Sequence, residues 1–400
     1  MSNEFDPHAT AEDHGIMHGF PPPPEQRINH YTWDKPPFHR WSFQHVREVV
    51  PTVNVGRGKK TFAIPKASNN AIDKLSIELP SGHKGTVFQH LAAMYTDGFL
   101  VVHKGKRIYE RYFNGMDART QHISQSMAKS VVGTVAGILI DQGVLKEDDL
   151  LTDYVPELGS CGYAGATVRH LLDMRSGIRY NEDYLDPDSD VSKSENACGW
   201  RPPRSDVPES LYEFILTVAA EREHGGHFAY RSIETDCLAW VLERASGTRL
   251  SDLVSDLIWQ PMGAEQDGCF TVDRAGACFA DGGFNATLRD FARFGMLYTD
   301  GRGIVPDNWI ANTKAGDVDV FVGPYKETFP RGAYRNQFWL TDVDRPILTA
   351  RGIYGQLIYI DPTADLVVTK LSSWPTPVDL PLLIDTLALI EGVAGEIGAR

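Results

Sequence analysis

A serine and a lysine three residues apart stand at the head of a long apolar segment. After Ser126 and Lys129, apolar residues recur at helical spacing: Val131, Val132, Val135, Ile138, Leu139 and Leu145. In the first turn of such a helix the two side chains share one face, with Cβ atoms roughly 5–6 Å apart. A buried amine with a lowered pKa can take the proton of a neighbouring hydroxyl, and the helix N-terminus offers backbone N–H groups to a developing oxyanion. The pattern predicts a centre for acyl transfer.

The same spacing also has a purely structural explanation, in which Ser126 caps the helix and Lys129 is a solvated charge. Few charges accompany Lys129 in this segment, which favours the catalytic alternative. A second copy of the spacing, Ser81 to Lys84, follows Pro80 and contains Gly82, so it predicts a turn. We interpret that copy as chance.

The composition limits the kinds of partner and compartment. The 400 residues carry a net charge of −14, which argues against nucleic acid and anionic membranes as partners. The chain lacks an apolar run of about 18 residues, and its first residues lack the apolar stretch of a secretory signal. Five cysteines without CxxC spacing predict reduced thiols. We therefore expect a cytoplasmic protein without a metal or another cofactor. The sequence leaves undecided whether the protein forms a homodimer.

The periodicity predicts one sheet assembled from both ends of the chain. Strand patterns at 99–103 and 107–113 flank a turn at 104–106, after a helix at 85–95. Strand patterns return late, and the region between is mostly helical. The late segments are strands at 337–341, 348–353, 356–360 and 366–370 and a helix at 378–397, and long loops are expected at 176–210 and 264–284.

This order favours an α+β fold, an antiparallel sheet flanked by helices with a large inserted helical subdomain. We expect the sheet to come from 85–125 and 335–400 and the helical subdomain from 126–334. Residues 1–84 are rich in proline and aromatic side chains, which predicts an arm packed on this catalytic body, 85–400.

Several other catalytic arrangements are excluded by the sequence. GxSxG, HExxH and P-loop patterns are absent. All thirteen histidines lie at or before His227, whereas an α/β-hydrolase needs its histidine late in the chain. A lysine-activated serine survives this elimination.

A tyrosine about 100 residues after the serine is the candidate proton carrier. Tyr230 and Ser232 follow a Gly225-Gly226 turn and precede a helical pattern at 234–245. A nearby cation stabilises a phenolate, so a tyrosine beside a lysine can share its proton. The structural alternative is a packed aromatic ring followed by a capping serine.

A late strand is the candidate pocket wall. Gly352 would let the backbone approach a substrate closely, and the Ile353 N–H could pair with the Ser126 N–H as an oxyanion hole. Another triplet, Lys314-Ala315-Gly316, follows a helical pattern at 306–313, and we discount it.

Together these residues resemble the serine β-lactamase and penicillin-binding-protein superfamily. Within it, the chain is similar to the class C-like branch, with its esterases and the 6-aminohexanoate-dimer hydrolases (nylon-oligomer hydrolases). The resemblance covers roughly 90 to 400. It rests on the ordered set Ser126-x-x-Lys129, Tyr230-x-Ser232 and Gly352, and on the segments Thr167–Gly177, Gly282–Thr287 and Asp290–Gly295.

The resemblance implies a β-lactamase-like fold and roles for further residues. Ser126 would be the nucleophile, Lys129 the base and Tyr230 the proton relay, with Tyr184, Ser232, Gly352 and Trp339 at the substrate. The chain departs from the family where Ser232 replaces the asparagine of YxN and Ala350-Arg351-Gly352 replaces KTG. Both departures weaken the case for β-lactam turnover, because the lysine helps to bind the drug's carboxylate.

The resemblance therefore implies hydrolysis of a small carboxylic ester or a linear amide, including 6-aminohexanoate oligomers, through an acyl-enzyme. A β-lactamase, a D-amino-acid peptidase or a catalytically silent binding domain are the alternatives. Several carboxylates follow Tyr184. One explanation is a solvated acidic loop; the other is that Asp190 or Glu195 binds a substrate ammonium group.

Overall fold

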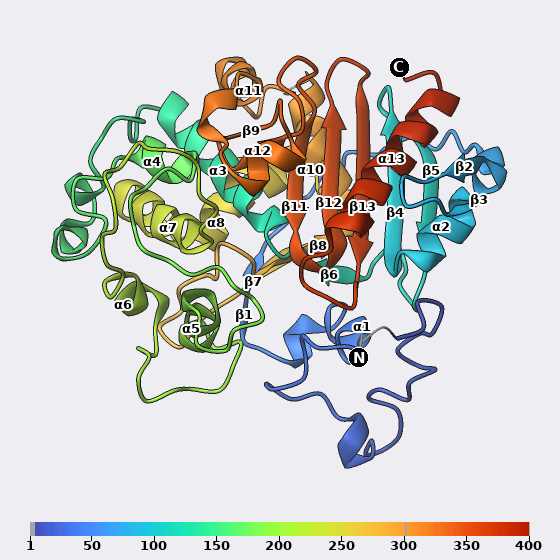
Figure 1. The fold of residues 1–400 in the computed structure, drawn as a ribbon, viewed down its shortest axis with the longest axis horizontal. Coiled ribbons are helices and arrows are strands. Elements are labelled where there is room, and N and C mark those ends of the chain that lie inside the picture. Colours follow the sequence, from blue (N-terminus) through green and yellow to red (C-terminus); the bar gives the residue numbers. More distant parts are fainter. Residues whose placement is uncertain (1–4, 301, 400) are drawn as a thin grey trace.

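A seven-stranded antiparallel sheet forms the centre of the protein, in a computed structural model that describes residues 5–300 and 302–399 (Figure 1). The strand order is β5-β4-β13-β12-β11-β10-β9. The strands are β4 (Thr96–His103), β5 (Lys106–Tyr112), β9 (Ala333–Arg335), β10 (Phe338–Leu340), β11 (Leu348–Gly352), β12 (Gln356–Asp361) and β13 (Leu366–Ser372). The α+β class predicted from the sequence is confirmed.

Segments from the two ends of the chain meet at the middle of this sheet. Strand β13 lies beside β4, with Leu366 opposite His103 and Ser372 opposite Thr96. The predicted hairpin of β4 and β5 turns at Lys104 and Gly105. The sheet therefore forms only when β13, from late in the chain, pairs with the hairpin of β4 and β5 near residue 100.

Two layers of helices cover the faces of the sheet. Successive strand residues point to opposite faces, so Val101 and Val368 belong to one core cluster and Val102 and Val367 to the other. The first cluster contains α2 (Val87–Ala93) and α13 (Leu380–Glu396), and Figure 1 shows α13 crossing in front of the strands. The second cluster contains α3 (Met127–Asp141) and α10 (Leu288–Asp300). The helix that follows Ser126 is thus packed into the larger core.

A smaller four-stranded sheet was not predicted from the sequence. Its antiparallel order is β1-β7-β8-β6, from β1 (Thr52–Val55), β6 (Gln121–Ile123), β7 (Gly268–Thr271) and β8 (Phe284–Thr287). We had expected a loop at 264–284, which contains β7, and a mostly helical region, which contains β8. Each strand has three or four residues, too few for a clear period of two, and β1 pairs with a partner more than 200 residues away (Thr52 with Thr271).

The region beside the large sheet is mainly helical, as predicted, and lies at its β9 edge (Figure 1). The expected loop at 176–210 contains a short helix, α5, whose start is capped by Ser189. The remaining helices are α1 (His39–Ser42), α4 (Val168–Leu172), α5 (Asp190–Ala197), α6 (Leu211–Ile215), α7 (Ile233–Ser246), α8 (Leu250–Val254), α9 (Gln260–Met262), α11 (Asp307–Lys314) and α12 (Pro324–Thr328).

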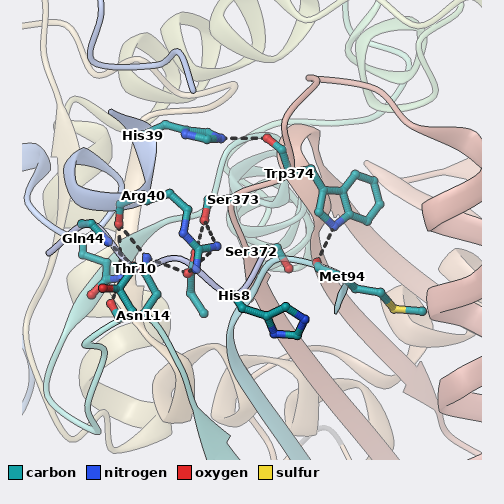
Figure 2. A network of polar contacts seen from close by, with 12 residues as sticks. His8, Thr10, His39, Arg40, Gln44, Met94, Asn114, Ser372, Ser373 and Trp374 are labelled. Atoms are coloured by element: carbon teal, nitrogen blue, oxygen red, sulfur yellow. Dashed lines mark hydrogen bonds and ion pairs between the residues drawn. The ribbon is translucent and has the colours of Figure 1, made fainter. Parts of the chain in front are cut away.

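Buried polar contacts attach the N-terminal arm to the body (Figure 2). The His39 ring donates from Nε2 to the Trp374 carbonyl oxygen at 2.7 Å. Arg40 donates to Ser373 Oγ at 3.3 Å and lies 3.8 Å from an Asp97 carboxylate oxygen. Asn114 donates to the Arg40 carbonyl oxygen at 2.7 Å. The arm therefore holds the segment that follows β13, although the division of the chain at residue 84 stays a prediction.

The helices of this protein are shorter or more polar than membrane-spanning helices. Within 5–300 and 302–399, none combines the length and the apolar character that a bilayer span requires.

Candidate active site

The Ser126 and Lys129 side chains contact each other at the start of α3. Ser126 directly precedes the helix, and Lys129 Nζ donates to Ser126 Oγ at 2.8 Å. Lys129 is 1% exposed, so the alternative of a solvated lysine is wrong. Its burial follows from the apolar residues around it, because every residue of α3 from Met127 to Leu139 is buried.

The charge of Lys129 differs from the sequence-based expectation. Burial alone would lower the pKa of its ammonium group, but electrostatic interactions, first with Asp281 and then with Tyr230 and Glu182, outweigh burial, and the pKa is raised. Lys129 Nζ donates to the Asp281 carbonyl oxygen at 2.9 Å and lies 3.8 Å from the Asp281 carboxylate. We had expected an amine with a lowered pKa; the resting site instead holds an ammonium group.

A second buried carboxyl group lies behind Asp281. Asp236 Oδ1 accepts from the backbone N–H groups of Ala280 and Asp281, at 2.9 and 3.2 Å. Burial, and then the like charge of Asp281, raise the pKa of Asp236 well above its usual range. These carboxyl groups belong to the segment before β8 and to α7, and sequence reasoning did not identify either of them, because no short spacing connects them to Lys129.

Tyr230 lies over the serine–lysine pair. Its ring centroid is 5.2 Å from Lys129 Nζ, and the polar groups of Ser126 and Lys129 both favour ionisation of its hydroxyl. Burial raises the pKa of the Tyr230 phenol, and the Lys129 charge opposes that rise. The ring stacks on Trp339 of β10, with centroids 5.4 Å apart at 24°. Tyr230 is thus both a packed aromatic ring and the polar neighbour of Ser126.

Glu182 is a site residue that the sequence analysis did not identify. Its carboxylate accepts from the Ser232 backbone N–H at 2.9 Å, from the Ser232 hydroxyl and from the Tyr184 hydroxyl at 2.7 Å. Burial raises the pKa of Glu182, and Lys129 opposes the rise. Glu182 therefore ties the 181–184 loop to the start of α7. The sequence feature that could have identified Glu182 is its position two residues before Tyr184, which was itself predicted at the substrate.

Gly352 brings strand β11 against the chain that enters α3. A Cβ atom on Gly352 would lie 2.5 Å from the Ser124 carbonyl oxygen and 2.9 Å from Gln125 Cβ. We had expected Gly352 to let the backbone approach a substrate; in the structure its close approach is to Ser124 and Gln125. The consequence is that Ser126 and Ile353, the two residues whose backbone N–H groups the sequence predicts as oxyanion donors, line one cavity.

The cavity at Ser126 has a volume of about 640 Å³ and mostly apolar walls. Of the residues predicted at the substrate, the structure brings Tyr184, Trp339, Gly352 and Ile353 to its wall together with Tyr230. Ser232 instead faces Glu182 and does not line the cavity. The other apolar lining residues are Leu185, Pro324, Tyr325, Phe329, Leu357, Trp374, Pro377, Val378, Leu380 and Leu383.

The structure does not bring Asp190 and Glu195 to this cavity. Asp190 begins α5 and accepts from the Asn181 backbone N–H at 2.7 Å. Glu195 is 8% exposed and forms an ion pair of 2.5 Å with Arg201, which also binds Asp34. Burial raises the pKa of Glu195 to about 7 despite the Arg201 charge. Both carboxylates satisfy neighbouring protein groups, so this geometry does not support the ammonium-binding hypothesis.

The site shows no arrangement that would hold a metal. In residues 5–300 and 302–399, no group of three His, Cys, Asp or Glu side chains gathers closely enough to bind an ion. The chemistry available is that of a hydroxyl, an ammonium group, a phenol and two backbone donors. Such a set suits acyl transfer through a covalent intermediate.

Two proteins described as 6-aminohexanoate-dimer hydrolases are similar to this chain over most of its length. The chain is 37% identical over 354 residues to a 6-aminohexanoate-dimer hydrolase of Paenarthrobacter ureafaciens, covering 86% of this chain and 88% of that protein. A solved structure from Bacillus anthracis, provisionally named a 6-aminohexanoate-dimer hydrolase, shares 27% identity with a TM-score of 0.86, covering 94% of this chain and 99% of that one.

A more distant solved structure shows the fold alone. EstCE1, a hydrolase with promiscuous acyltransferase activity, has a TM-score of 0.60 at 17% identity, covering 76% of this chain and 98% of that one. The family model described as Beta-lactamase matches residues 86–391. Its members are serine hydrolases that act on amides and esters. The chain therefore belongs to the β-lactamase family.

Proposed function

We propose that this protein hydrolyses small carboxylic esters or linear amides through an acyl-enzyme on Ser126. The observation that carries the proposal is the 2.8 Å hydrogen bond between Lys129 Nζ and Ser126 Oγ, beside Tyr230 and at the wall of a largely apolar cavity. A relative with 37% identity named for the 6-aminohexanoate dimer supports a linear amide of that kind among the substrates.

The reaction begins with loss of the Ser126 hydroxyl proton. Because Lys129 is an ammonium group in the resting site, the reactive form is the one in which the Lys129–Tyr230 pair carries one proton fewer. That pair takes the proton from Oγ as Oγ attacks the carbonyl carbon. The N–H groups of Ser126 and Ile353 hold the oxyanion of the tetrahedral intermediate.

The intermediate collapses when the bond to the leaving group breaks. Tyr230 gives the transferred proton to the leaving alcohol or amine, and the acyl group stays on Ser126 Oγ as an ester. A water molecule then attacks the carbonyl carbon of this ester while the Lys129–Tyr230 pair takes one of its protons. The bond to Ser126 Oγ breaks, the pair gives that proton to Oγ, and the carboxylic acid is released.

The compartment is part of the proposal. The five cysteines, at 161, 198, 237, 269 and 278, are all free thiols. Unpaired cysteines are typical of a reducing compartment, which supports a cytoplasmic enzyme with a small-molecule substrate. A cytoplasmic location would leave cell-wall peptides out of reach, so a D-amino-acid peptidase is the weaker alternative.

A substrate panel tests the proposal. We expect the protein to hydrolyse short-chain 4-nitrophenyl esters and the 6-aminohexanoate dimer, and to turn over the β-lactam nitrocefin poorly. Faster turnover of nitrocefin than of the esters would favour the β-lactamase alternative. Absence of turnover and of a stoichiometric burst with every ester would favour a catalytically silent binding domain.

A further inference from the structure

An arginine in the cavity wall lacks the acidic partner that buried arginines usually have. Arg351 is in β11, one residue before Gly352 and two before Ile353. Gly352 faces Ser124 and Gln125, so Arg351 projects from the opposite face of the strand. Thr349 shares that face and is the register partner of Trp339. Arg351 lines the same cavity as Ser126 and Ile353, the two proposed oxyanion donors.

The contacts of Arg351 are few and mostly aromatic. Its Nε donates to Thr349 Oγ1 at 2.8 Å, and its Cζ lies 4.7 Å from the Phe329 ring centroid and 5.3 Å from that of Trp339. Its Nη2 is buried without a hydrogen-bond partner. Burial lowers the pKa of Arg351 to about 9, and no neighbouring charge opposes this effect. A charged group in this setting is costly without a counter-ion.

The three arginines that are buried in the described part of the chain, unlike the partly exposed Arg351, have carboxylates nearby. Arg293 lies 2.8 Å from Asp290, Arg40 lies 3.8 Å from Asp97, and Arg231 lies 3.8 Å from Glu234. In the described part of the chain, no Asp or Glu oxygen comes within 4.0 Å of Arg351. Arg351 differs from these three arginines because no carboxylate of the described residues serves as its counter-ion.

The carboxylates that line the same cavity are engaged elsewhere. Glu182 accepts from Ser232 and Tyr184, Asp183 accepts from the Leu185 N–H at 2.9 Å, and Asp379 caps α13 through the Leu382 N–H at 2.9 Å. None of them forms an ion pair with Arg351. An anion delivered with the substrate would meet an available guanidinium N–H in a largely apolar space, where a charge-assisted hydrogen bond is strongest.

We propose that Arg351 binds a carboxylate of the substrate, so that the enzyme prefers esters or amides that carry a free carboxylate away from the scissile bond. This inference rests on the proposed function, because it concerns the same cavity. It gives Arg351 a substrate-binding role and makes it a determinant of specificity. The competing explanation is that Arg351 only packs between Phe329 and Trp339.

Matched substrates separate these explanations. One ester, mono-4-nitrophenyl adipate, carries a carboxylate; its partner, methyl 4-nitrophenyl adipate, does not. A second pair puts the charge on the leaving group, as hexanoyl esters of 4-hydroxybenzoate and of its methyl ester. In Arg351→Met, kcat/KM for the carboxylate-bearing substrate of at least one pair should fall by about 10-fold or more, which is the effect of losing a charge-assisted hydrogen bond. The value of kcat/KM for the neutral substrate of that pair should change by less than about 3-fold.

Two further variants control for folding and for total charge. Arg351→Lys keeps the positive charge but loses the planar guanidinium group, so its kcat/KM for the carboxylate-bearing substrates should lie between the values of the wild type and Arg351→Met. Arg345→Met removes an arginine that is 46% exposed and bound to Glu391 and Asp361. This substitution should change kcat/KM equally for the charged and the neutral substrate of each pair. If Arg351→Met does not fold, the comparison rests on Arg351→Lys. Equal losses for charged and neutral members in both pairs would overturn the proposal.

A binding experiment keeps this inference apart from the proposed function. Titration calorimetry with hexanoate and hexanamide compares a carboxylate with a neutral group of similar shape, without catalysis. We expect hexanoate to bind the wild type about 10-fold more tightly than hexanamide and to lose that advantage in Arg351→Met. Equal or absent binding of the two compounds overturns the role of Arg351. If hexanoate binds as expected but no ester is hydrolysed, only the proposed function fails.

Discussion

Gly352 lies so close to Ser124 that a Cβ atom at position 352 would come within 2.5 Å of the Ser124 carbonyl oxygen. This contact joins β11 to the residues that lead into α3. The two proposed oxyanion donors, Ser126 and Ile353, each follow this contact by one or two residues. The geometry of the donor pair therefore depends on a glycine that does not itself touch the serine side chain.

We expect the substitution Gly352→Ala to increase the distance between the two proposed oxyanion donors, the backbone N–H groups of Ser126 and Ile353. Backbone atoms at Ser124 cannot move aside as a flexible side chain would, so β11 must shift away from α3. Loss of one oxyanion donor costs a factor of about 100 to 1,000 in kcat, and overpacking costs about 1–3 kcal/mol of unfolding free energy. The measurements are kcat and urea unfolding.

Gly159→Ala is the matched control, since its nearest neighbour is Thr152 Cγ2 at an ordinary 3.7 Å. It should leave both kcat and unfolding free energy nearly unchanged. A Gly352→Ala enzyme with wild-type kcat would show that Ile353 is not an oxyanion donor.

Ser126→Ala should abolish turnover while changing the unfolding free energy by less than about 1 kcal/mol, because only a small hydroxyl is removed. A fluorophosphonate should label the wild type at Ser126, as located by mass spectrometry of peptides. Ser130, which is buried one turn later on α3 and donates to the Gln337 carbonyl oxygen, is the control position. Label on any other serine contradicts the assignment.

Lys129→Ala and Tyr230→Phe should each lower kcat by several orders of magnitude, because each removes a member of the pair that handles the Ser126 proton. Tyr230→Phe keeps the ring that stacks on Trp339, so its folding should be preserved. Since the two residues act as one unit, the double variant should be scarcely slower than the worse single variant. Strictly multiplicative losses would mean that the two side chains act independently. A Tyr230→Phe enzyme with most of its activity would leave Tyr230 only a packing role.

The arm should make stability depend on pH through His39. Burial lowers the pKa of His39 from an ordinary 6.5 to about 4, so the unfolded chain binds a proton that the folded chain does not. The contribution of His39 to the free energy of unfolding is therefore fully present above pH 6.5 and is lost as the pH falls toward 4. The total loss is about 3 kcal/mol. Urea unfolding at pH 7 and pH 5 measures the loss, of which about 2 kcal/mol falls in that interval.

His39→Gln should reduce this pH dependence, because it removes the titrating ring and keeps a donor for the Trp374 carbonyl oxygen. His18→Gln, at an exposed position on the same arm, is the control and should keep the wild-type dependence. The same loss of stability in His39→Gln as in the wild type would place the titrating group elsewhere.

The sequence by itself determined the elements whose signals are local. The helix after Ser126 was predicted because apolar residues recur along one segment, and the structure places α3 at Met127–Asp141. The hairpin and the late strands were predicted from strand-like segments next to turn residues, and their predicted positions agree with β4, β5 and β10 to β13. The spacing of Ser126 and Lys129 suffices to bring their side chains together, because both lie within one helical turn.

Only the tertiary structure decided the features that depend on distant segments. The sheet of β1, β6, β7 and β8 joins short segments from residues 52 to 287, and no single segment carries enough pattern to reveal it. The charge of Lys129 was predicted with the wrong sign of pKa shift, because burial can be read from local sequence whereas the opposing charge of Asp281 comes from 152 residues away. Glu195 was expected at the pocket, but folding gives it Arg201 as a partner. Local spacing fixes which side chains share a turn; electrostatic environment is fixed by whatever the fold packs against them.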